Sequence, residues 1–279
     1  MYANTSLAAN TQENPTIVDS LLHPLALPIR RLLVRSDRRE LNQILIDDEE
    51  NILQALEAGI SIQSVYYSGE GNISNVLRQK LPRRVTIHEV AKRTCKKLFE
   101  NEKISRVFAI AITPKQVGLE TLLGGSRDVI VLEDVRISGN IGAIIRTSLA
   151  LNAGGIVLLN ADPVDIYDRR LIRASRGYVF SLPVVAVSTE EFLKACKRQD
   201  ASLMVATTHA DMVVHHIANL PQRLFVVFGS EKNGCSHLIM RAASHHVRIP
   251  INPKVESLNV SAAASVLLYN RIQFNSARL

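Results

Sequence analysis

The sequence predicts an α/β protein in which a small N-terminal α/β unit precedes a larger unit with a parallel sheet. Short apolar runs alternate with helical patterns along most of the chain. In the second half these runs are nearly continuous, which is typical of strands covered on both faces. A segment over 114–127 with three glycines and a serine separates the halves, as expected of a linker.

The first half is predicted to hold strands and helices in alternation. Residues 1–15 are polar and lack periodicity, so we expect a loose tail there. Acidic residues in the first turn and Gly59 at the end favour a helix over 48–58. Apolar runs predict strands at 41–46, 62–67, 85–88 and 107–112, with helices at 73–81 and 89–99.

The second half repeats the alternation with more apolar strands. These are predicted at 129–132, 155–159, 184–187, 203–206, 224–228 and 247–251. Helices are predicted between and after them at 141–152, 166–175, 190–197, 238–244 and 258–274. The chain is therefore divided into an N-terminal domain over 1–117, a linker over 118–126 and a C-terminal domain over 127–279.

Composition excludes several classes of protein. Of the 279 residues, 47% are hydrophobic and 21% charged, so the chain is not expected to be disordered throughout. No apolar run approaches the roughly 18 residues of a membrane span. The N-terminus shows no secretory pattern, and three separated cysteines without a CxxC pair argue against disulfides and a cysteine zinc site. We expect a cytoplasmic protein.

The positive charge is concentrated in one stretch of the sequence. Residues 78–106 contain ten basic and three acidic residues, a net +7 that equals the charge of the whole chain. A second cluster comprises Arg30, Arg31, Arg35, Arg38 and Arg39. Phe99 is the single Phe, Tyr or Trp in this stretch, so phosphate contacts are favoured over base stacking. A solvated helix face is the better interpretation for any single lysine, whereas the whole stretch favours RNA or DNA.

Several familiar sites are missing. No GxGxxG follows a strand and no GxxxxGK[ST] occurs, so dinucleotide and phosphate-loop signatures are absent. His215-His216 and His245-His246 are adjacent pairs whose side chains diverge, which makes them poor metal chelators. No metal site is predicted.

Three polar segments follow predicted strands. The first, 138–146, opens an apolar helix with Asn140 as a good N-cap and carries Arg146, which spacing alone places on an exposed face. The second, 228–234, has the sequence FGSEKNG at the carboxyl end of a strand, where ligands of parallel sheets gather. Its Glu231 could equally be a cap or turn residue. The third, 249–264, leads into a helix of small residues that Ser257 or Asn259 could cap.

The order of these segments, N(x5)R, then FGSE(x2)G, then IPI followed by SLNVSAAA, resembles the three motifs of the SPOUT superfamily of RNA methyltransferases, in its ribose 2'-O-methyltransferase branch. Residues 168–185, 139–151 and 98–111 are similar to the thiostrepton and nosiheptide resistance enzymes in particular. The resemblance covers nearly the whole chain, more strongly after residue 127 and least over the first 40 residues.

The resemblance implies a C-terminal domain tied in a deep trefoil knot, an exception to the rule that chains do not thread loops. It further implies an N-terminal RNA-binding domain of ribosomal-protein type and a homodimer that shares its active sites. S-adenosyl-L-methionine would be the cofactor, with no metal. Residues matching the family's cofactor positions are Arg146, Arg176, Thr207, Gly229, Ile249 and Leu258.

The resemblance also implies the catalytic and RNA-binding residues. Arg146 would act on the 2'-hydroxyl, as a base or as an electrostatic and positioning group. The rest of the polar site would be Asn140, Glu231, Ser257 and Asn259. Arg173 and Arg176, three residues apart on one expected helical face, would face RNA, and Arg176 could instead meet the methionine carboxylate. RNA contacts from the basic stretch would be Arg93, Lys96, Lys97 and Lys103.

The activity implied is 2'-O-methylation of an adenosine ribose in 23S rRNA, which would block thiopeptide antibiotics. One alternative is a ribose of another rRNA or tRNA nucleotide. An alternative of a different class is a non-catalytic RNA-binding protein, against which the presence of Arg146, Glu231 and Asn259 argues. A nucleotide-dependent dehydrogenase lacks its glycine fingerprint.

Overall fold

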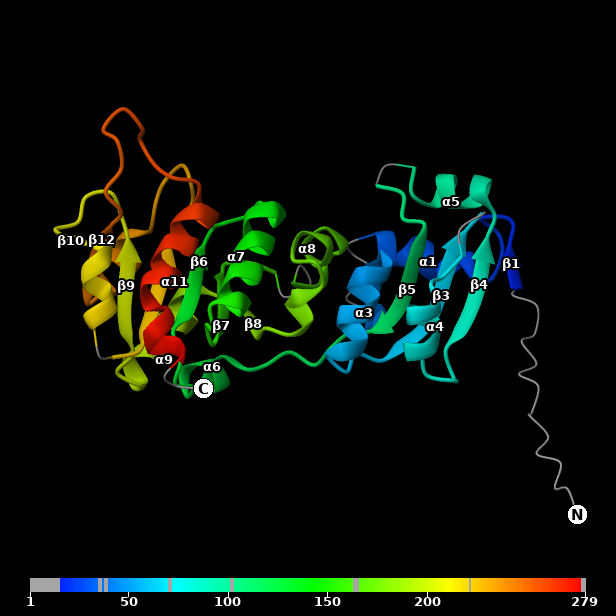
Figure 1. The fold of residues 1–279 in the computed structure, drawn as a ribbon, viewed down its shortest axis with the longest axis horizontal. Helices are drawn as coiled ribbons and strands as arrows, with labels where there is room; N and C mark the ends of the chain where they lie inside the picture. The colour runs from blue at the N-terminus through cyan, green and yellow to red at the C-terminus, as the bar shows by residue number, and fades with distance from the viewer. Residues whose placement is uncertain are drawn as a thin grey trace, which may run out of the picture.

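The computed structural model describes residues 16–34, 37, 40–69, 72–100, 103–162, 166–220 and 222–276. They form an N-terminal lobe (16–112) and a C-terminal lobe (119–276), each built around its own sheet and joined by the segment 113–118 (Figure 1). The tail predicted over 1–15 lies outside the described residues. Three arginines of the second basic cluster, Arg35, Arg38 and Arg39, also lie outside them.

The N-terminal lobe has three layers. Its elements are β1 (Thr16–Val18), α1 (Ala26–Leu33), β2 (Gln43–Asp47), α3 (Glu49–Glu57), β3 (Ile62–Ser68), α4 (Asn75–Lys80), β4 (Thr86–Val90), α5 (Lys92–Leu98) and β5 (Val107–Ile112). The sheet has the order β1-β4-β3-β5-β2, in which β5 is antiparallel to both of its neighbours. Buried residues of α1 and α5 cover one face, and those of α3 and α4 cover the other.

The structure confirms the strands and helices predicted for this lobe, with two differences. The helix predicted over 89–99 begins too early, because Val90 still belongs to β4 and pairs with both Val18 and Ser68. The sequence patterns predict no element over 16–40, where β1 and α1 lie. β1 has only three residues, and α1 contains Pro28, so neither gives a clear periodic signal.

The C-terminal lobe is a parallel α/β unit. Its elements are α6 (Leu119–Leu123), β6 (Val129–Glu133), α7 (Ser138–Ala150), β7 (Gly155–Leu159), α8 (Arg169–Ala174), η2 (Tyr178–Phe180), β8 (Val184–Val187), α9 (Thr189–Arg198), β9 (Ser202–Ala206), β10 (Met212–Val213), η3 (Val214–Asn219), β11 (Leu224–Phe228), α10 (His237–Ala242), β12 (His245–Arg248) and α11 (Val260–Ser276). The sheet order is β10-β12-β9-β11-β6-β7-β8, and each of these pairings is parallel. This confirms the predicted fold class.

Both faces of this sheet are buried, which explains the continuous apolar runs. Along β6, Val129 and Val131 pack in the cluster formed with α6, α9 and α10. Ile130 and Leu132 point to the other face and pack in the cluster with α7 and α11. A strand flanked by helices on both sides has no face left for polar residues.

Several boundaries differ from prediction in this lobe: α7 begins at Ser138 instead of 141 and α8 at Arg169 instead of 166, and the linker and β12 differ as well. The predicted linker contains α6, because Leu119, Leu122 and Leu123 are buried against the sheet. β12 starts and ends earlier than predicted, so Ile249 and Ile251 lie in the loop that follows. The three-part division of the chain and the trefoil knot stay predictions. No helix in the described part of the chain has the length and apolar character needed to cross a bilayer.

A buried ion pair fixes α11 to the sheet. Both side chains of Arg271 and Asp128 are inaccessible to solvent, with Nε 2.8 Å from Oδ2. The guanidinium also donates to the carbonyl oxygens of Ile217, Leu220 and Gln222 at 2.7–2.8 Å. One side chain therefore connects α11, β6 and the segment that leads into β11.

Candidate active site

The three polar segments lie at the carboxyl edge of the parallel sheet. Each follows a strand of that sheet: 134–146 follows β6, 229–236 follows β11 and 249–259 follows β12. Because all these strands run the same way, their ends gather at one edge.

Asn140 connects the three segments. Its Nδ2 donates a hydrogen bond to Oε1 of Glu231, and its Oδ1 accepts one from Nδ2 of Asn259 at 3.1 Å. The predicted N-cap role of Asn140 is wrong, because α7 begins at Ser138 and Ile137 occupies the cap position. The side chain of Asn140 is therefore directed to the neighbouring segments instead of its own helix.

Asn259 has two functions in this cluster. Besides donating to Asn140, its Oδ1 accepts hydrogen bonds from the backbone N–H of Ser261 at 2.9 Å and from its hydroxyl at 2.6 Å. Of the two candidate caps for the last helix, the structure selects Asn259. The start of α11 is therefore linked to the polar cluster.

A cleft of about 570 Å³ opens beside this cluster. It is lined by the four non-arginine residues predicted to contact the cofactor, namely Thr207, Gly229, Ile249 and Leu258. Glu231 and Ser257 also line it. The volume falls in the range of cofactor sites, and the lining mixes aliphatic side chains with a few polar groups. Arg146, Asn140 and Asn259 are not part of the lining.

The wall at 229–234 depends on a glycine. Ser230 and Gly234 exchange backbone hydrogen bonds of 3.2 and 2.9 Å, which fold the segment back on itself. A Cβ at Gly229 would overlap the backbone of Gly234 and Cys235. Only glycine permits this turn to close, so the shape of the cleft depends on Gly229.

Glu133 holds the far end of that wall, and the sequence interpretation missed it. This buried residue ends β6, and its carboxylate accepts hydrogen bonds from the Ser236 N–H at 2.8 Å and hydroxyl at 2.7 Å. Burial and the Glu133 charge raise the pKa of Cys235, which lines the cleft, to about 12, so its thiol is neutral at ordinary pH. The available signal was an acidic residue ending an otherwise apolar strand.

The two predicted arginines of the site lie outside the cleft lining. Arg146 is exposed on α7, and no described residue forms an ion pair or hydrogen bond with its side chain. Arg176 is also exposed, but the expected shared helical face with Arg173 is wrong, since α8 ends at Ala174 and Arg176 has a positive φ of 52°. Arg173 instead lies 3.4 Å from the carboxylate of Asp47 in the N-terminal lobe.

The basic stretch presents one clear cationic surface. Arg93, Lys96 and Lys97 are exposed on α5, whose other side is buried in the lobe. Lys103 is exposed as well and lies 3.9 Å from Asp48. Lys80 is instead paired with Glu57 at 2.6 Å. Exposed positive charge therefore lies on and beside α5, and Arg83 and Arg84 before β4 are exposed as well.

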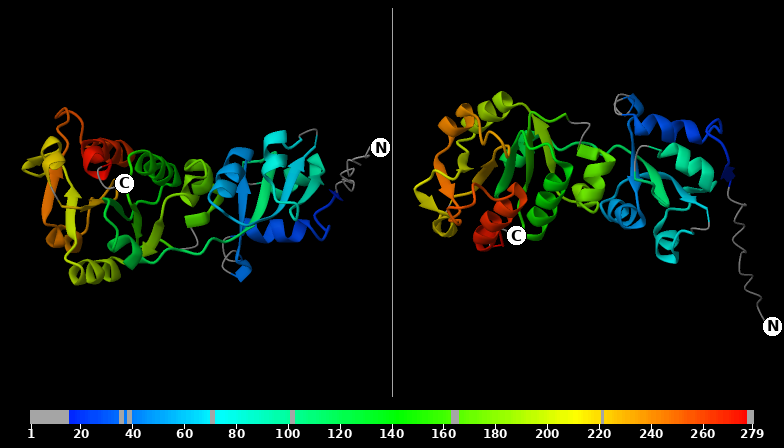
Figure 2. Two further views of the ribbon diagram at one scale, coloured as in Figure 1. Left: turned by 60° about the horizontal axis from the view of Figure 1, so that its bottom comes forward. Right: turned by 90° about the horizontal axis from the view of Figure 1, so that it is seen from above.

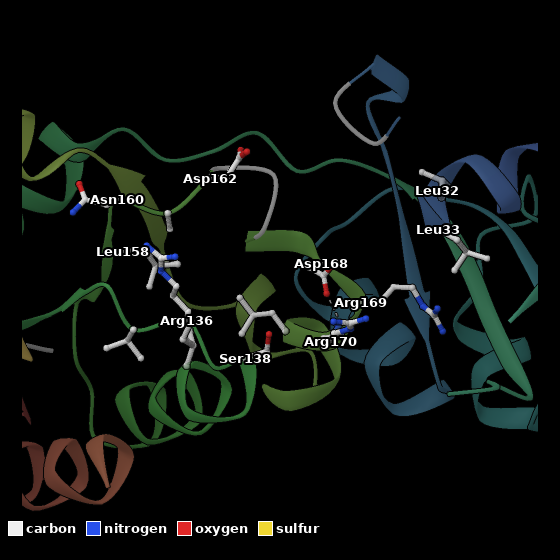
Figure 3. A pocket seen from close by; sticks show the side chains of 14 residues that line it. Leu32, Leu33, Arg136, Ser138, Leu158, Asn160, Asp162, Asp168, Arg169 and Arg170 are labelled. Carbon is white, nitrogen blue, oxygen red and sulfur yellow. Dashed lines mark hydrogen bonds between the residues drawn. The ribbon is translucent and has the colours of Figure 1, made fainter. Parts of the chain in front are cut away.

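A second cavity lies between the lobes. It has a volume of about 630 Å³ and is lined by residues of α1, α7, α8 and the end of β7. In Figure 3, Arg169 and Arg170 of α8 lie between Ser138 and Leu32. Within the described ranges, no group of three or more His, Cys, Asp or Glu side chains could hold a metal ion.

Comparison with known proteins identifies the class. The SpoU rRNA Methylase family model matches residues 128–269, which contain the three segments and the cleft. The chain therefore belongs to the SpoU rRNA methylase family. A model described as the N terminus of thiostrepton-resistance methylases matches residues 15–125.

Individual relatives cover nearly the whole chain. A 23S rRNA (adenosine(1067)-2'-O)-methyltransferase from Streptomyces azureus is 37% identical over 94% of this chain and 98% of its own length. A solved RNA 2'-O ribose methyltransferase superposes with a TM-score of 0.79 at 29% identity, covering 92% of this chain and 98% of the other. The SpoU methyltransferase AviRb from Streptomyces viridochromogenes, solved in complex with AdoMet, superposes with a TM-score of 0.73 at 25% identity, covering 88% and 96%.

Proposed function

We propose that the protein uses S-adenosyl-L-methionine to methylate the 2'-oxygen of an adenosine in 23S rRNA, at the position named for its Streptomyces azureus relative, and so confers resistance to thiopeptide antibiotics. The observation that carries this proposal is the cluster of Asn140, Glu231 and Asn259 beside a cofactor-sized cleft. It would act in the cytoplasm, where ribosomes are assembled.

The cleft suits S-adenosylmethionine. Thr207, Gly229, Ile249 and Leu258 would hold it, and the backbone of the turn at 229–234 could approach an adenine closely because Gly229 has no side chain. Arg176 lies outside the lining of this cleft; it would meet an RNA phosphate, or the methionine carboxylate where two copies share an active site. Bound there, the cofactor supplies an electrophilic methyl group.

The protein would then prepare the attacking ribose. A 2'-hydroxyl reacts faster when it is aligned and when its proton is removed or the developing negative charge is stabilised. Arg146 is exposed and available for this role on α7, six residues after Asn140. Because a guanidinium holds its proton too tightly to act readily as a base, positioning and charge stabilisation are its natural contributions. Glu231, Ser257 and Asn259 would complete the polar surroundings.

A homodimer would place a second copy of the chain against the surface formed by α7 and α11. α7 and α11 pack side by side, and the Thr147 and Ser265 hydroxyls lie 3.3 Å apart. Tyr269 on α11 is 69% exposed, and Ile137 before α7 is 56% exposed. These side chains belong to α11 or adjoin α7, the pair of helices that a second copy would cover in the proposed homodimer.

Methylation mapping tests the function. The protein should transfer a labelled methyl group from S-adenosylmethionine to a single adenosine ribose of 23S rRNA, located by ribose-methylation-sensitive primer extension. Labelling of a different rRNA or a tRNA would favour the alternative target. RNA binding without any methyl transfer would favour the alternative that the protein is a non-catalytic RNA-binding protein.

Gly229→Ala should weaken cofactor binding. The added methyl group overlaps the backbone of Gly234 and Cys235 and forces the cleft wall to move. Overpacking of this kind costs about 1–3 kcal/mol, or roughly 5- to 150-fold in Kd if the cost falls on the binding-competent wall. Isothermal calorimetry with S-adenosylmethionine measures it. Gly118→Ala is the control, since a Cβ there meets no atom within 4 Å. Unchanged affinity of Gly229→Ala would contradict the assignment of the cleft.

Replacing Arg93, Lys96 and Lys97 together with alanine should weaken RNA binding. The slope of log affinity against log salt should flatten by about 0.7 to 0.9 for each RNA phosphate that the variant no longer binds. Filter binding over a range of salt concentrations measures both quantities, and cofactor affinity should not change. Replacing Lys194, Lys197 and Arg198 on α9 removes the same charge from another exposed helix and should have little effect. Equal effects of the two triple variants would show that α5 is only a solvated face.

A further inference from the structure

The two lobes meet through a buried ion pair that the mechanism above does not use. Asp47, the last residue of β2, is fully buried, and Arg169 of α8 is nearly so. The Nε and Nη2 atoms of Arg169 each donate to a different oxygen of Asp47 at 2.8 Å. Arg173, one turn further along α8, lies 3.4 Å from the same carboxylate. One carboxylate of the N-terminal lobe therefore faces two arginines of the C-terminal lobe.

Neighbouring contacts fix the orientation of this pair. The Arg169 guanidinium lies over the Phe99 ring, 4.6 Å from its centroid, and also donates to the Lys103 carbonyl oxygen at 3.3 Å. The Asp47 carbonyl oxygen accepts a hydrogen bond from the Asn51 side chain of α3 at 2.7 Å. In both views of Figure 2, α8 lies at the end of its lobe that faces the N-terminal lobe. A two-pronged arginine–carboxylate contact restricts rotation as well as distance.

The chain turns immediately after α8, and it turns against the N-terminal lobe. Arg176 and Gly177 have positive φ values of 52° and 76°. The backbone of Gly177 packs so closely on α3 that a Cβ there would lie 2.7 Å from Cβ of Gln54 and 3.2 Å from Cα of Asn51. The position of Arg176 is therefore set from both sides, by α8 before it and by α3 behind Gly177.

We propose that Asp47 is a positioning residue for methyl transfer. Through Arg169 and Arg173 it holds α8 and the Arg176–Gly177 turn against the lobe that carries the basic surface of α5. The lobe proposed to bind RNA thereby determines where Arg176 lies relative to the rRNA backbone or the cofactor. The inference rests on the proposed function, since it assigns Asp47 an effect only through Arg176.

Asp47→Asn in the full-length protein tests the proposal. Asparagine keeps the shape but removes the charge that two arginines share. The single-turnover rate of rRNA methylation should fall roughly 10- to 100-fold, as expected when a reacting group is displaced by about 1 Å. The Kd values for S-adenosylmethionine and for rRNA should each change by a smaller factor than the rate, because a positioning role acts mainly in the transition state. Asp48→Asn is the matched control, because Asp48 is adjacent, partly exposed and 3.9 Å from Lys103; its rate should equal that of the wild type.

A double-variant cycle separates positioning from a general loss of structure. If Asp47 acts through Arg176, Asp47→Asn should lower the rate of an Arg176→Ala protein by less than about threefold, because the two changes remove the same contribution. Gly177→Ala is a second variant that keeps Asp47 and both arginines but forces the turn away from α3, since its Cβ would lie 2.7 Å from Cβ of Gln54. It should lower the rate of the wild type, and it should likewise have little effect in the Arg176→Ala background. Thermal unfolding shows whether Asp47→Asn folds. If it does not fold, Gly177→Ala tests whether the contact between the lobes acts through Arg176.

The possible outcomes are distinct. A wild-type protein that transfers no methyl group overturns the proposed function itself. An active wild type, an impaired Arg176→Ala and a normal Asp47→Asn overturn only the positioning role. Equal losses from Asp47→Asn in both backgrounds, or a loss confined to rRNA affinity, would show that Asp47 acts independently of Arg176 and would also overturn it.

Discussion

Arg146→Ala is expected to lower the rate of methyl transfer by about 10²- to 10⁴-fold while the protein stays folded. The side chain is exposed on α7 and contributes no described ion pair or hydrogen bond, so its removal should cost little stability. The loss of rate is that of a group which assists proton removal or stabilises developing charge. Single-turnover assays with labelled S-adenosylmethionine and rRNA measure it.

Three further measurements help to interpret the effect of Arg146→Ala. Sedimentation equilibrium should give the same oligomeric state for the variant and the wild type, and rRNA affinity should persist because the cationic contacts proposed for α5 are unchanged. Arg146→Lys keeps the charge but loses the planar fork, so an inactive lysine variant would favour positioning by the guanidinium. If the rate of the Arg146→Lys variant recovers as the pH rises, removal of the 2'-hydroxyl proton by this residue is favoured. Near-normal turnover by Arg146→Ala would return Arg146 to the role of an ordinary exposed residue.

Arg271→Met is expected to lower the free energy of unfolding by about 3–5 kcal/mol. The substitution leaves the Asp128 carboxylate buried without its counter-ion, and it removes the donors of the carbonyl groups of Ile217, Leu220 and Gln222. Chemical denaturation followed by circular dichroism measures the loss. Arg241→Met, on the exposed side of α10, should change stability by less than about 0.5 kcal/mol.

The double variant Arg271→Met with Asp128→Asn should be more stable than Arg271→Met alone. Neutralising the carboxylate removes most of the cost of a buried charge that has lost its Arg271 partner, and the amide can still accept the hydrogen bond of the Leu224 N–H. If the double variant is as unstable as the sum of two independent losses, the ion pair does not account for the effect of Arg271.

The sheet of the C-terminal lobe was predictable because its central strands carry apolar residues on both faces. Residues of β6, β7 and β11 are apolar at every position but Glu133 and Gly155, and this occurs only where helices cover both faces. β1, α1 and β10 were not predictable, because two or three strand residues and a helix containing a proline have no periodicity to detect. The glycine-rich surroundings of α6 dominate the local composition, so the pattern there favours a linker over a helix.

The site was predictable in part. The family motifs placed Asn140, Glu231 and Asn259 together, and the structure connects them by hydrogen bonds. The same motifs selected four residues that line one cleft. They gave no signal for Glu133, which supports the cleft wall, because its partner Ser236 is about a hundred residues away in the chain.

The class of sheet, the basic stretch and the order of the three polar segments can be predicted without a structure, since each depends on residues close together in the chain. The packing of distant segments decided that Asn140 bonds to other segments and does not cap its own helix. It also decided that Arg173 faces Asp47 across the lobes and that Arg176 leaves the helix. These depend on contacts between side chains more than 90 residues apart, whose partners are chosen by packing and by the need to pair buried charge, which no local pattern encodes.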